Sequence, residues 1–265
     1  VSDETEFYYE GNSQETMLVT AGDSWTWGDS LDAKFRHSEI YGNHLAQALE
    51  ADWLNVGCRG WSNSYILDYV TEIARQLHTS NYKKIYIVVT LTENGRDVTT
   101  PANFPYNYST TFDTLGVTEQ FYTQVLAAAE QHWIQQLNTI QSADSRIKLV
   151  VGNNFAWHNQ IGLLDNALQL NWIECLANAQ GLPRPIRTNL VTGWIIDGID
   201  NNIHRRIPVT NKTTFKSWAL PYIERADAVN RWFDSSPMNY KKASKHPTAA
   251  GHRVWADYIL NNLND

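Results

Sequence analysis

The stretch TMLVTAGDSW, residues 16–25, contains the feature on which the fold depends. Its first half is a short apolar run, typical of a strand that is buried on both faces. The run ends at Gly22, and an acid and a hydroxyl follow at once, as Asp23 and Ser24. A glycine, an acid and a serine at a strand end predict a tight turn with a helix cap, and they also place a hydroxyl where it can react.

The same tripeptide returns as Gly28-Asp29-Ser30. No strand-like run precedes this second copy, so we interpret it as a loop. The first copy directly follows a predicted strand, and Ser24 is therefore the candidate nucleophile.

Strand-like and helix-like segments alternate along the rest of the chain. Further strands are predicted at 52–56, 84–91, 147–152 and 188–193, and helices at 38–51, 64–78, 119–140, 214–233 and 249–263. Within the second of these helices one stripe at helical spacing contains Tyr65, Ile66, Tyr69, Val70, Ile73, Ala74 and Leu77.

Strands that alternate with helices pair in parallel through right-handed crossovers. We therefore predict an α/β protein, a three-layer α/β/α sandwich. The chain shows no linker and no repeat, so residues 1–265 are expected to form a single domain. Residues 1–15 are expected to be an N-terminal extension, and 96–118 a loop insertion of a length that is usually functional.

Composition limits the function classes. The formal net charge is −7, and binding to nucleic-acid phosphates needs clustered Lys and Arg, so no nucleic-acid partner is expected. No apolar run is long enough for a membrane span, and no signal peptide is visible, although the absence of an initial Met leaves processing, and with it the compartment, open. The oligomeric state is open as well. Cys58 and Cys175 lack metal-site spacing and fit either two buried thiols or one disulfide.

Ligands of parallel α/β sheets bind at the carboxyl ends of the strands, and the segments that follow the predicted strands carry suitable groups. These segments are NVGCRGWSN (55–63), TENGRD (92–97) and NNFAWHNQ (153–160), with KHPTAAGH (245–252) near the C-terminus. A serine nucleophile needs a base and hydrogen-bond donors for the oxyanion that it creates. The candidate base is His246, and the candidate donors are the backbone N–H groups of Ser24 and Gly60 and the side chain of Asn94.

Taken in order, these blocks resemble the SGNH hydrolases, also called the GDSL esterase/lipase family. GDSWTWG (22–28) is similar to the nucleophile block, NVGCRGWS (55–62) to the block with the oxyanion glycine, TEN (92–94) to the asparagine block and HPTAAGH (246–252) to the histidine block. The resemblance implies a flavodoxin-like sheet of five parallel strands and catalysis by Ser24, Gly60, Asn94 and His246 through an acyl-enzyme, with no metal or cofactor. It also implies a substrate with a small acyl group on a sugar or glycan, or a lipid ester. The 11 Trp favour the carbohydrate ester.

The sequence departs from the family pattern at two positions. The acid expected three residues before the histidine is replaced by Ala243, and Glu93 stands where the asparagine block usually has glycine. Disturbing the orienting acid of a serine protease costs about 10⁴ in kcat, roughly 5.5 kcal/mol. Three explanations stay open: another group orients His246, the protein is a catalytically weak or inactive binding or structural module, or Ala243 is an introduced change.

Three further residues are candidates for lining the substrate site. Trp25 follows the nucleophile, Trp61 follows the oxyanion glycine, and His158 follows the fourth strand. The alternatives are core packing for the two tryptophans and a solvated loop for His158. Asp23 is expected to structure its turn, and Thr248 to cap the last helix.

Overall fold

The computed structural model of the chain describes residues 7–11, 15–29, 31–92, 119–153, 164, 167–172, 175, 179 and 247–263. The expected loop insertion at 96–118, the expected strand at 188–193 and the expected helix at 214–233 lie outside the described residues.

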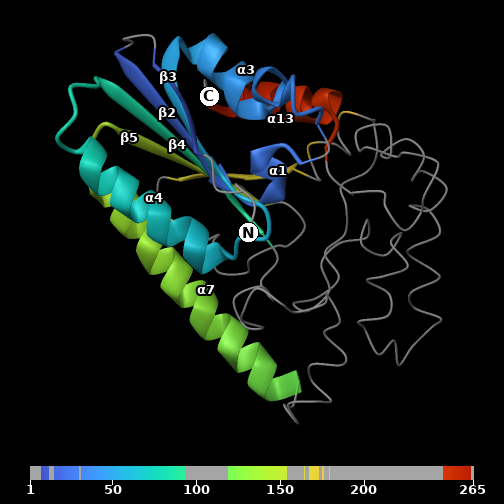
Figure 1. The fold of residues 1–265 in the computed structure, drawn as a ribbon. Helices are drawn as coiled ribbons and strands as arrows, with labels where there is room; N and C mark the ends of the chain where they lie inside the picture. Colours follow the sequence, from blue (N-terminus) through green and yellow to red (C-terminus); the bar gives the residue numbers. More distant parts are fainter. Residues whose placement is uncertain are drawn as a thin grey trace, which may run out of the picture.

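The described residues form one sheet of six strands, in the order β1-β3-β2-β4-β5-β6 (Figure 1). The strands are β1 (Tyr8–Glu10), β2 (Thr16–Gly22), β3 (Ala51–Gly57), β4 (Lys84–Leu91), β5 (Ile147–Asn153) and β6 (Leu168–Asn171). The five strands from β3 to β6 pair in parallel, and β1 pairs antiparallel with β3 at one edge. The parallel part has the flavodoxin-like order 2-1-3-4-5, which confirms the predicted sheet.

Two strands of this sheet were not predicted. Residues 8–10, expected to lie in an N-terminal extension, form the edge strand β1. The fifth parallel strand is β6, whose four residues read LQLN. So short a segment, with polar and apolar residues mixed, gives no period that distinguishes a strand from a loop.

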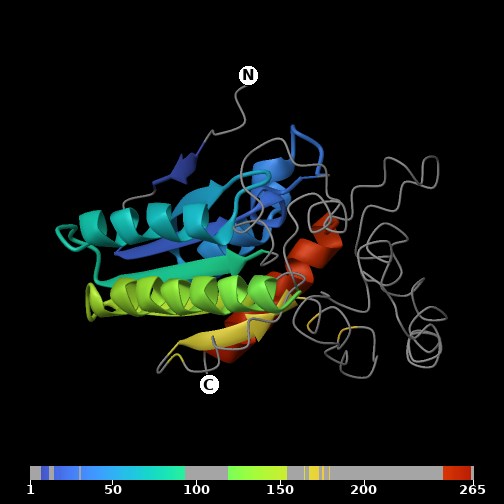
Figure 2. The same cartoon turned by 90° about the horizontal axis from the view of Figure 1, so that it is seen from below.

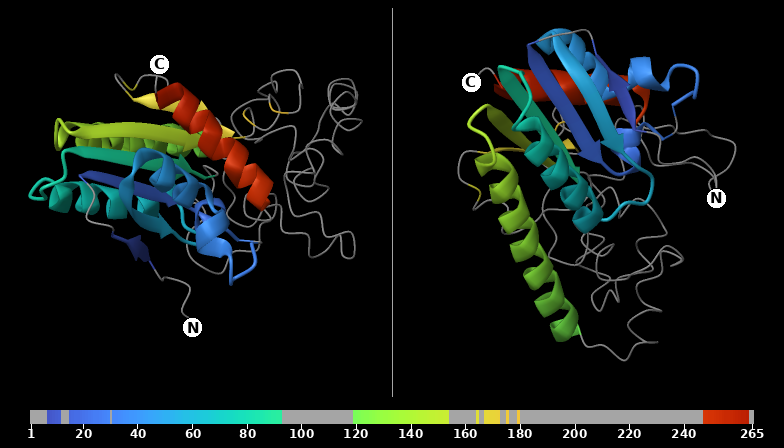
Figure 3. Two further views of the ribbon diagram at one scale, coloured as in Figure 1. Left: turned by 90° about the horizontal axis from the view of Figure 1, so that it is seen from above. Right: turned by 60° about the vertical axis from the view of Figure 1, so that its left-hand side comes forward.

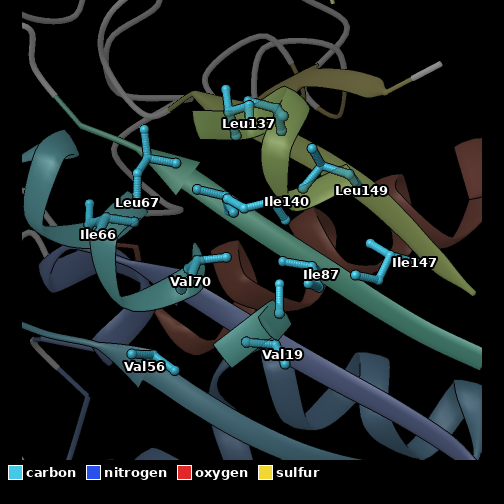
Figure 4. Close-up of a cluster of buried hydrophobic side chains, with 14 of the residues drawn as sticks. Val19, Val56, Ile66, Leu67, Val70, Ile87, Leu137, Ile140, Ile147 and Leu149 are labelled. Carbon is cyan, nitrogen blue, oxygen red and sulfur yellow. The ribbon is translucent and has the colours of Figure 1, made fainter. Parts of the chain in front are cut away.

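Helices cover both faces of the sheet, which confirms the three layers (Figures 1 and 2). The helices α3 (Tyr41–Leu49) and α13 (Ala249–Leu263) lie on one face, and α4 (Asn63–Leu77) and α7 (Glu119–Ser142) lie on the other. Neighbouring strand residues point to opposite layers, so Leu18 packs in the cluster under α3 and α13. Val19 packs in the cluster under α4 and α7, which Figure 4 shows.

The helices α4, α7 and α13 lie within two residues of the predicted ranges, but the predicted helix at 38–51 is wrong in its bounds. It is two helices, α2 (Arg36–Glu39) and α3, separated by Ile40 in an extended conformation. The Ile40 side chain is buried, so packing of this one residue outweighs continuation of the helix.

The predicted buried stripe of α4 is too wide. Ile66 and Val70 are fully buried, whereas 63% of Tyr65 and 43% of Tyr69 are exposed. Each tyrosine precedes a buried residue by one position and therefore lies about 100° around the helix from it. The two tyrosines thus lie on the flank of the stripe that faces solvent.

At the edge where the strands begin, Arg146 joins several segments. Its guanidinium pairs with Asp144, with 2.6 Å between Nη2 and Oδ2. It also donates to backbone carbonyls at the end of α4 and in the following loop, those of Leu77, His78, Ser80 and Tyr82. The hydrogen bonds from Arg146 hold the pKa of Asp144 well below its ordinary value.

Candidate active site

The carboxyl ends of the parallel strands lie level with one another. Gly22 at the end of β2 is in register with Gly57 at the end of β3 and with Thr90 near the end of β4. The last residues of β5 and β6, Asn153 and Asn171, are likewise paired. The residues that follow β2 and β3 therefore emerge side by side, and those after β2 emerge between β3 and β4.

Ser24 is the first residue of the one-turn helix α1 (Ser24–Trp27), which directly follows β2. Asp23 caps this helix, because its Oδ1 accepts the Trp25 N–H at 3.0 Å. Its Oδ2 accepts the hydroxyl of Thr92, at the end of β4, at 2.7 Å. Both carboxylate oxygens of Asp23 thus fix the turn, as expected from the sequence, and join the ends of β2 and β4.

Two glycines allow α1 to lie directly on the ends of the strands. A Cβ at Gly57 would stand 2.5 Å from the backbone nitrogen of Trp27 and 2.6 Å from the carbonyl carbon of Thr26. A Cβ at Gly22 would stand 2.9 Å from the carbonyl oxygen of Thr90. No side chain fits at such approaches to backbone, so glycine at both positions sets the height of Ser24 above the sheet.

The side chain of Asn55, on β3, links this strand to α1 and to β2. Its buried side chain donates to the Thr26 carbonyl at 3.3 Å, and its Oδ1 accepts the Gly57 N–H at 3.2 Å and the Thr20 hydroxyl at 3.1 Å. Asn55 was not among the residues predicted from the sequence. The available signal was a lone amide in the otherwise apolar end of a strand, where a buried polar group needs partners.

The loop that carries Gly60 is joined to both ends of the Ser24 segment. The Cys58 N–H donates to the Gly22 carbonyl at 3.1 Å. Arg59 forms an ion pair with Asp29, and its guanidinium carbon lies 4.0 Å from the centroid of the Trp27 ring. The structure therefore brings the Ser24 and Gly60 segments together, and Asp29 of the second Gly-Asp-Ser copy takes part in this contact.

Gly60 itself has a φ of +75°, a left-handed conformation that favours glycine. Apart from Gly60 and its two chain neighbours, no described residue has an atom within 4 Å of the position that its Cβ would occupy. Gly28 and Asp29 of the second Gly-Asp-Ser copy lie in a turn, which agrees with the loop interpreted from the sequence, and Gly28 has the left-handed conformation that ends α1. Ser30 lies outside the described residues.

Asn63, the first residue of α4, fixes the end of β4. Its Oδ1 accepts the Thr92 N–H at 2.7 Å, and its Nδ2 donates to the Thr92 carbonyl at 3.2 Å. The side chain is completely buried. Asn63 was not predicted from the sequence either, because its partner Thr92 lies at the end of another segment, β4. Asn94 comes two residues after Thr92 and lies outside the described residues.

The helix α13 begins on the side of the molecule where α1 lies (Figures 1 and 3). Thr248 acts as its cap, as predicted, because its hydroxyl accepts the Gly251 N–H at 3.3 Å. His246 directly precedes the described segment, and Ala243 and His158 also lie outside the described residues. The roles of Asn94, His246 and His158 stay predictions.

A buried tyrosine supports α1 from the side of α3. The Tyr41 hydroxyl lies 3.2 Å from the hydroxyl oxygens of both Thr26 and Thr90. Burial raises the pKa of Tyr41 to about 12, so this side chain stays protonated over the working range of proteins. Its backbone N–H donates to Nδ1 of the buried His252 at 3.4 Å, which gives His252 a packing role.

The two candidate tryptophans have different surroundings. Trp25 is 1% exposed and meets Trp172 edge to face, with ring centroids 5.0 Å apart, in the cluster under α13. Its burial supports the core-packing alternative. Trp61 is only partly buried, and it stacks on Tyr69 with ring centroids 4.7 Å apart.

Both cysteines, Cys58 and Cys175, are buried free thiols, which decides between the two alternatives left by the sequence. Burial raises the pKa of the Cys175 thiol. Within the described ranges, no three His, Cys, Asp or Glu side chains gather as a metal site. Among the helices of the described part, none is both long and apolar enough to cross a membrane.

No model of a known protein family matches the chain, and no curated protein matches it. Solved structures to which it is similar include a member of the lipolytic G-D-S-L family from Veillonella parvula, at 12% identity and a TM-score of 0.41, covering 94% of this chain and 98% of that one. A carbohydrate esterase, described as having divergent catalytic and non-catalytic binding functions in its active site, is 12% identical with a TM-score of 0.40, covering 96% of this chain and 69% of that one. A lipase from a goat rumen metagenome is 12% identical with a TM-score of 0.41, covering 93% and 96%.

Proposed function

We propose that the chain is a serine esterase that hydrolyses a carboxylic ester, with a small acyl group, through an acyl-enzyme. Ser24 Oγ attacks the acyl carbonyl, and His246 takes the hydroxyl proton and passes it to the leaving alcohol. The N–H groups of Ser24 and Gly60 and the amide of Asn94 stabilise the oxyanion. Water then attacks the acyl-enzyme, His246 takes its proton and returns it to Ser24, and the carboxylic acid leaves.

The observation that carries this proposal is the joining of the Ser24 and Gly60 segments at the carboxyl edge of the sheet. The Cys58 N–H bonds to the Gly22 carbonyl, and Arg59 pairs with Asp29. Asp23 is adjacent to Ser24, but its two oxygens already bond to Trp25 and Thr92. This structural use of both oxygens favours a general base from elsewhere, and His246 is the residue for which the sequence argues.

The alternative is a module of the same fold that binds an ester or glycan without turnover, and Ala243 in place of an acid favours it. A binding module does not need a serine nucleophile, so the two functions separate on the consequence of removing Ser24.

The test is hydrolysis of p-nitrophenyl acetate by the wild-type chain, by Ser24→Ala and by Ser38→Ala. Ser38 lies on α2 and bonds to the Phe35 carbonyl, so it is a matched serine away from the site. Ser24→Ala is expected to lower kcat/KM by roughly 10³ or more, and Ser38→Ala to leave it unchanged. Equal rates for wild type and Ser24→Ala would overturn the proposal.

A second substitution, Ala243→Asp, separates the explanations for the missing acid. If no other group orients His246, restoring the acid raises kcat by roughly a hundredfold or more. If another group already orients the ring, kcat stays within about twofold of the wild-type value. A protein that hydrolyses the ester neither with nor without the acid contradicts the esterase proposal and leaves the binding-module alternative.

A further inference from the structure

Two arginines, one on α2 and one in the Gly60 loop, converge on a single aromatic ring at the end of α1. They are Arg36 and Arg59, here called the arginine pair. Their guanidinium carbons lie 3.6 and 4.0 Å from the centroid of the Trp27 ring, so they are no further apart than the sum of these two distances. Stacking on a tryptophan ring stabilises a guanidinium but leaves its charge in place. The arginine pair is therefore a local concentration of positive charge.

The second Gly-Asp-Ser copy holds the arginine pair together. A Cβ at Gly28 would stand 3.1 Å from Cγ of Arg36, so the glycine leaves room for this side chain beside α1. The next residue, Asp29, forms the ion pair with Arg59. The second copy of the tripeptide thus brings the two guanidinium groups to one place and supplies one carboxylate.

The arginine pair carries more positive charge than the described side chains around it balance. Burial lowers the pKa of Arg36, the charge of Arg59 lowers it further, and the charge of Asp29 raises it. Two cations therefore share one described carboxylate, and this carboxylate pairs with Arg59. Within the described part of the chain, Arg36 forms no ion pair of its own. One positive charge is left for a ligand.

Arg36 also has an unpaired donor. Its Nε is buried and has no hydrogen-bond acceptor among the described residues. The residue as a whole is only partly buried, so a ligand can still reach the guanidinium from solvent. A partly buried cation beside a second cation destabilises a fold unless an anion joins it. A charged group kept in such surroundings next to a proposed active site is a candidate for ligand binding.

The arginine pair adjoins the proposed active site along the chain and in space. Trp27 ends the one-turn helix that begins at Ser24, which places the two residues about 4.5 Å apart along the helix axis. The Asp29 N–H donates to the Ser24 carbonyl at 2.9 Å. Arg59 directly precedes Gly60, the proposed oxyanion donor. A small ester bound at Ser24 can therefore extend to the arginine pair.

The chemistry of the arginine pair indicates the class of ligand. The planar fork of a guanidinium matches the two oxygens of a carboxylate, and Asp29 already provides such a partner for Arg59. One unbalanced positive charge matches a group with one negative charge. A carboxylate therefore fits Arg36 better than a doubly charged phosphate monoester does.

We infer that the arginine pair binds a carboxylate of the substrate through Arg36, so that the substrate is an acyl ester of a hydroxy acid. Because the proposed acyl group is small, the carboxylate belongs to the alcohol part of the ester. The position of the ester bond rests on the proposed esterase function, whereas the binding of the carboxylate does not.

The binding test is isothermal titration of the full chain with 4-acetamidobenzoate, in which an amide stands where the substrate has its ester, and with the neutral 4-acetamidobenzamide. The wild-type chain is expected to bind the acid at least about tenfold more tightly than the amide, and Arg36→Gln is expected to abolish this preference. Lys34→Gln is the matched control. It removes a cation that lies 5.2 Å from the centroid of another ring, Phe35, and is expected to keep the preference.

The kinetic test compares two acetyl esters, 4-acetoxybenzoate and the neutral 4-acetoxybenzamide. The wild-type value of kcat/KM is expected to be at least about tenfold higher for the acid, mainly through a lower KM, because the carboxylate is held before and during the reaction. In Arg36→Gln the two values are expected to be equal within about twofold. In Lys34→Gln the ratio is expected to stay as in wild type.

Equal binding of the acid and the amide by the wild-type chain would overturn the inference, as would equal losses in Arg36→Gln and Lys34→Gln. If Arg36→Gln does not fold, Arg36→Lys decides, because it keeps the charge but not the planar fork. It is expected to bind the acid more weakly, and wild-type affinity would contradict the role of Arg36. Tighter binding of 4-acetamidophenyl phosphate than of the acid would overturn the assignment to a carboxylate.

The outcomes for this inference and for the proposed function are distinct. A preference for the acid that depends on Arg36, without hydrolysis of any ester, contradicts the proposed function alone. Hydrolysis that depends on Ser24, without a preference for the acid, contradicts this inference alone.

Discussion

Replacement of Asn63 by alanine is expected to remove the hydrogen bonds that fix Thr92 at the end of β4, two residues before Asn94. The substitution removes the acceptor of the Thr92 N–H, at 2.7 Å, and the donor to the Thr92 carbonyl, at 3.2 Å. Asn63 and Thr92 are both completely buried, so water does not replace these partners freely. Each buried group left unpaired costs about 1–3 kcal/mol, so the two groups together give a loss of about 2–6 kcal/mol in the free energy of unfolding.

Urea unfolding measures this loss, and steady-state kinetics on p-nitrophenyl acetate measure its effect on the site at a temperature where the variant is folded. Because the amide of Asn94 is proposed to bind the oxyanion, kcat is expected to fall by roughly tenfold or more while KM changes little. Asn262→Ala is the matched control, since it removes an asparagine bond to the Tyr258 carbonyl on α13. A loss of stability below about 0.5 kcal/mol, or an unchanged kcat in the folded variant, would contradict this role of Asn63.

Three further predictions follow from other contacts. Asp29→Ala and Arg59→Ala each remove the ion pair that joins the Gly60 loop to the Ser24 segment, and each is expected to lower kcat by a similar factor. The double variant is expected to lose no more than either single variant, and additive losses would contradict the coupling of Asp29 and Arg59. Asp144→Asn is expected to lower Tm at pH 7. Because the pKa of Asp144 is depressed in the folded state, the difference from wild type shrinks as the pH falls below about 4, and a constant difference in calorimetry contradicts this. Cys58 and Cys175 are expected to react with Ellman's reagent in denaturant but not in native buffer, where rapid reaction of either contradicts their burial.

The fold could be predicted from the sequence wherever a segment is long and periodic. The run KIYIVVTL is almost wholly apolar and gave β4 to the residue, and the stripe through Ile66 and Val70 gave α4. The four residues of β6 were missed, because a strand so short has no period. Ile40 divides a predicted helix because tertiary packing of one side chain decides the local conformation there.

The candidate site was predictable in its order along the chain but not in the contacts that hold it. Ser24 and Gly60 could be proposed because each follows a strand, and the carboxyl ends of parallel strands meet. The bonds of Asn63 to Thr92 and of Arg59 to Asp29 join residues from different segments, and they depend on strand order and register, which one sequence does not specify. The exposure of Tyr65 and Tyr69 was missed because periodicity locates the centre of a buried stripe better than its flanks.

The most direct test of Ser24 as an activated nucleophile is reaction of the full chain with a fluorophosphonate, followed by intact-mass and peptide-mass analysis. A serine activated by a base and an oxyanion hole attacks the phosphorus and keeps the phosphonyl group, while ordinary serines do not react. We expect one adduct per chain, on the peptide that contains Ser24, and none in Ser24→Ala. An unmodified wild-type chain, or an adduct that persists in Ser24→Ala, would contradict it.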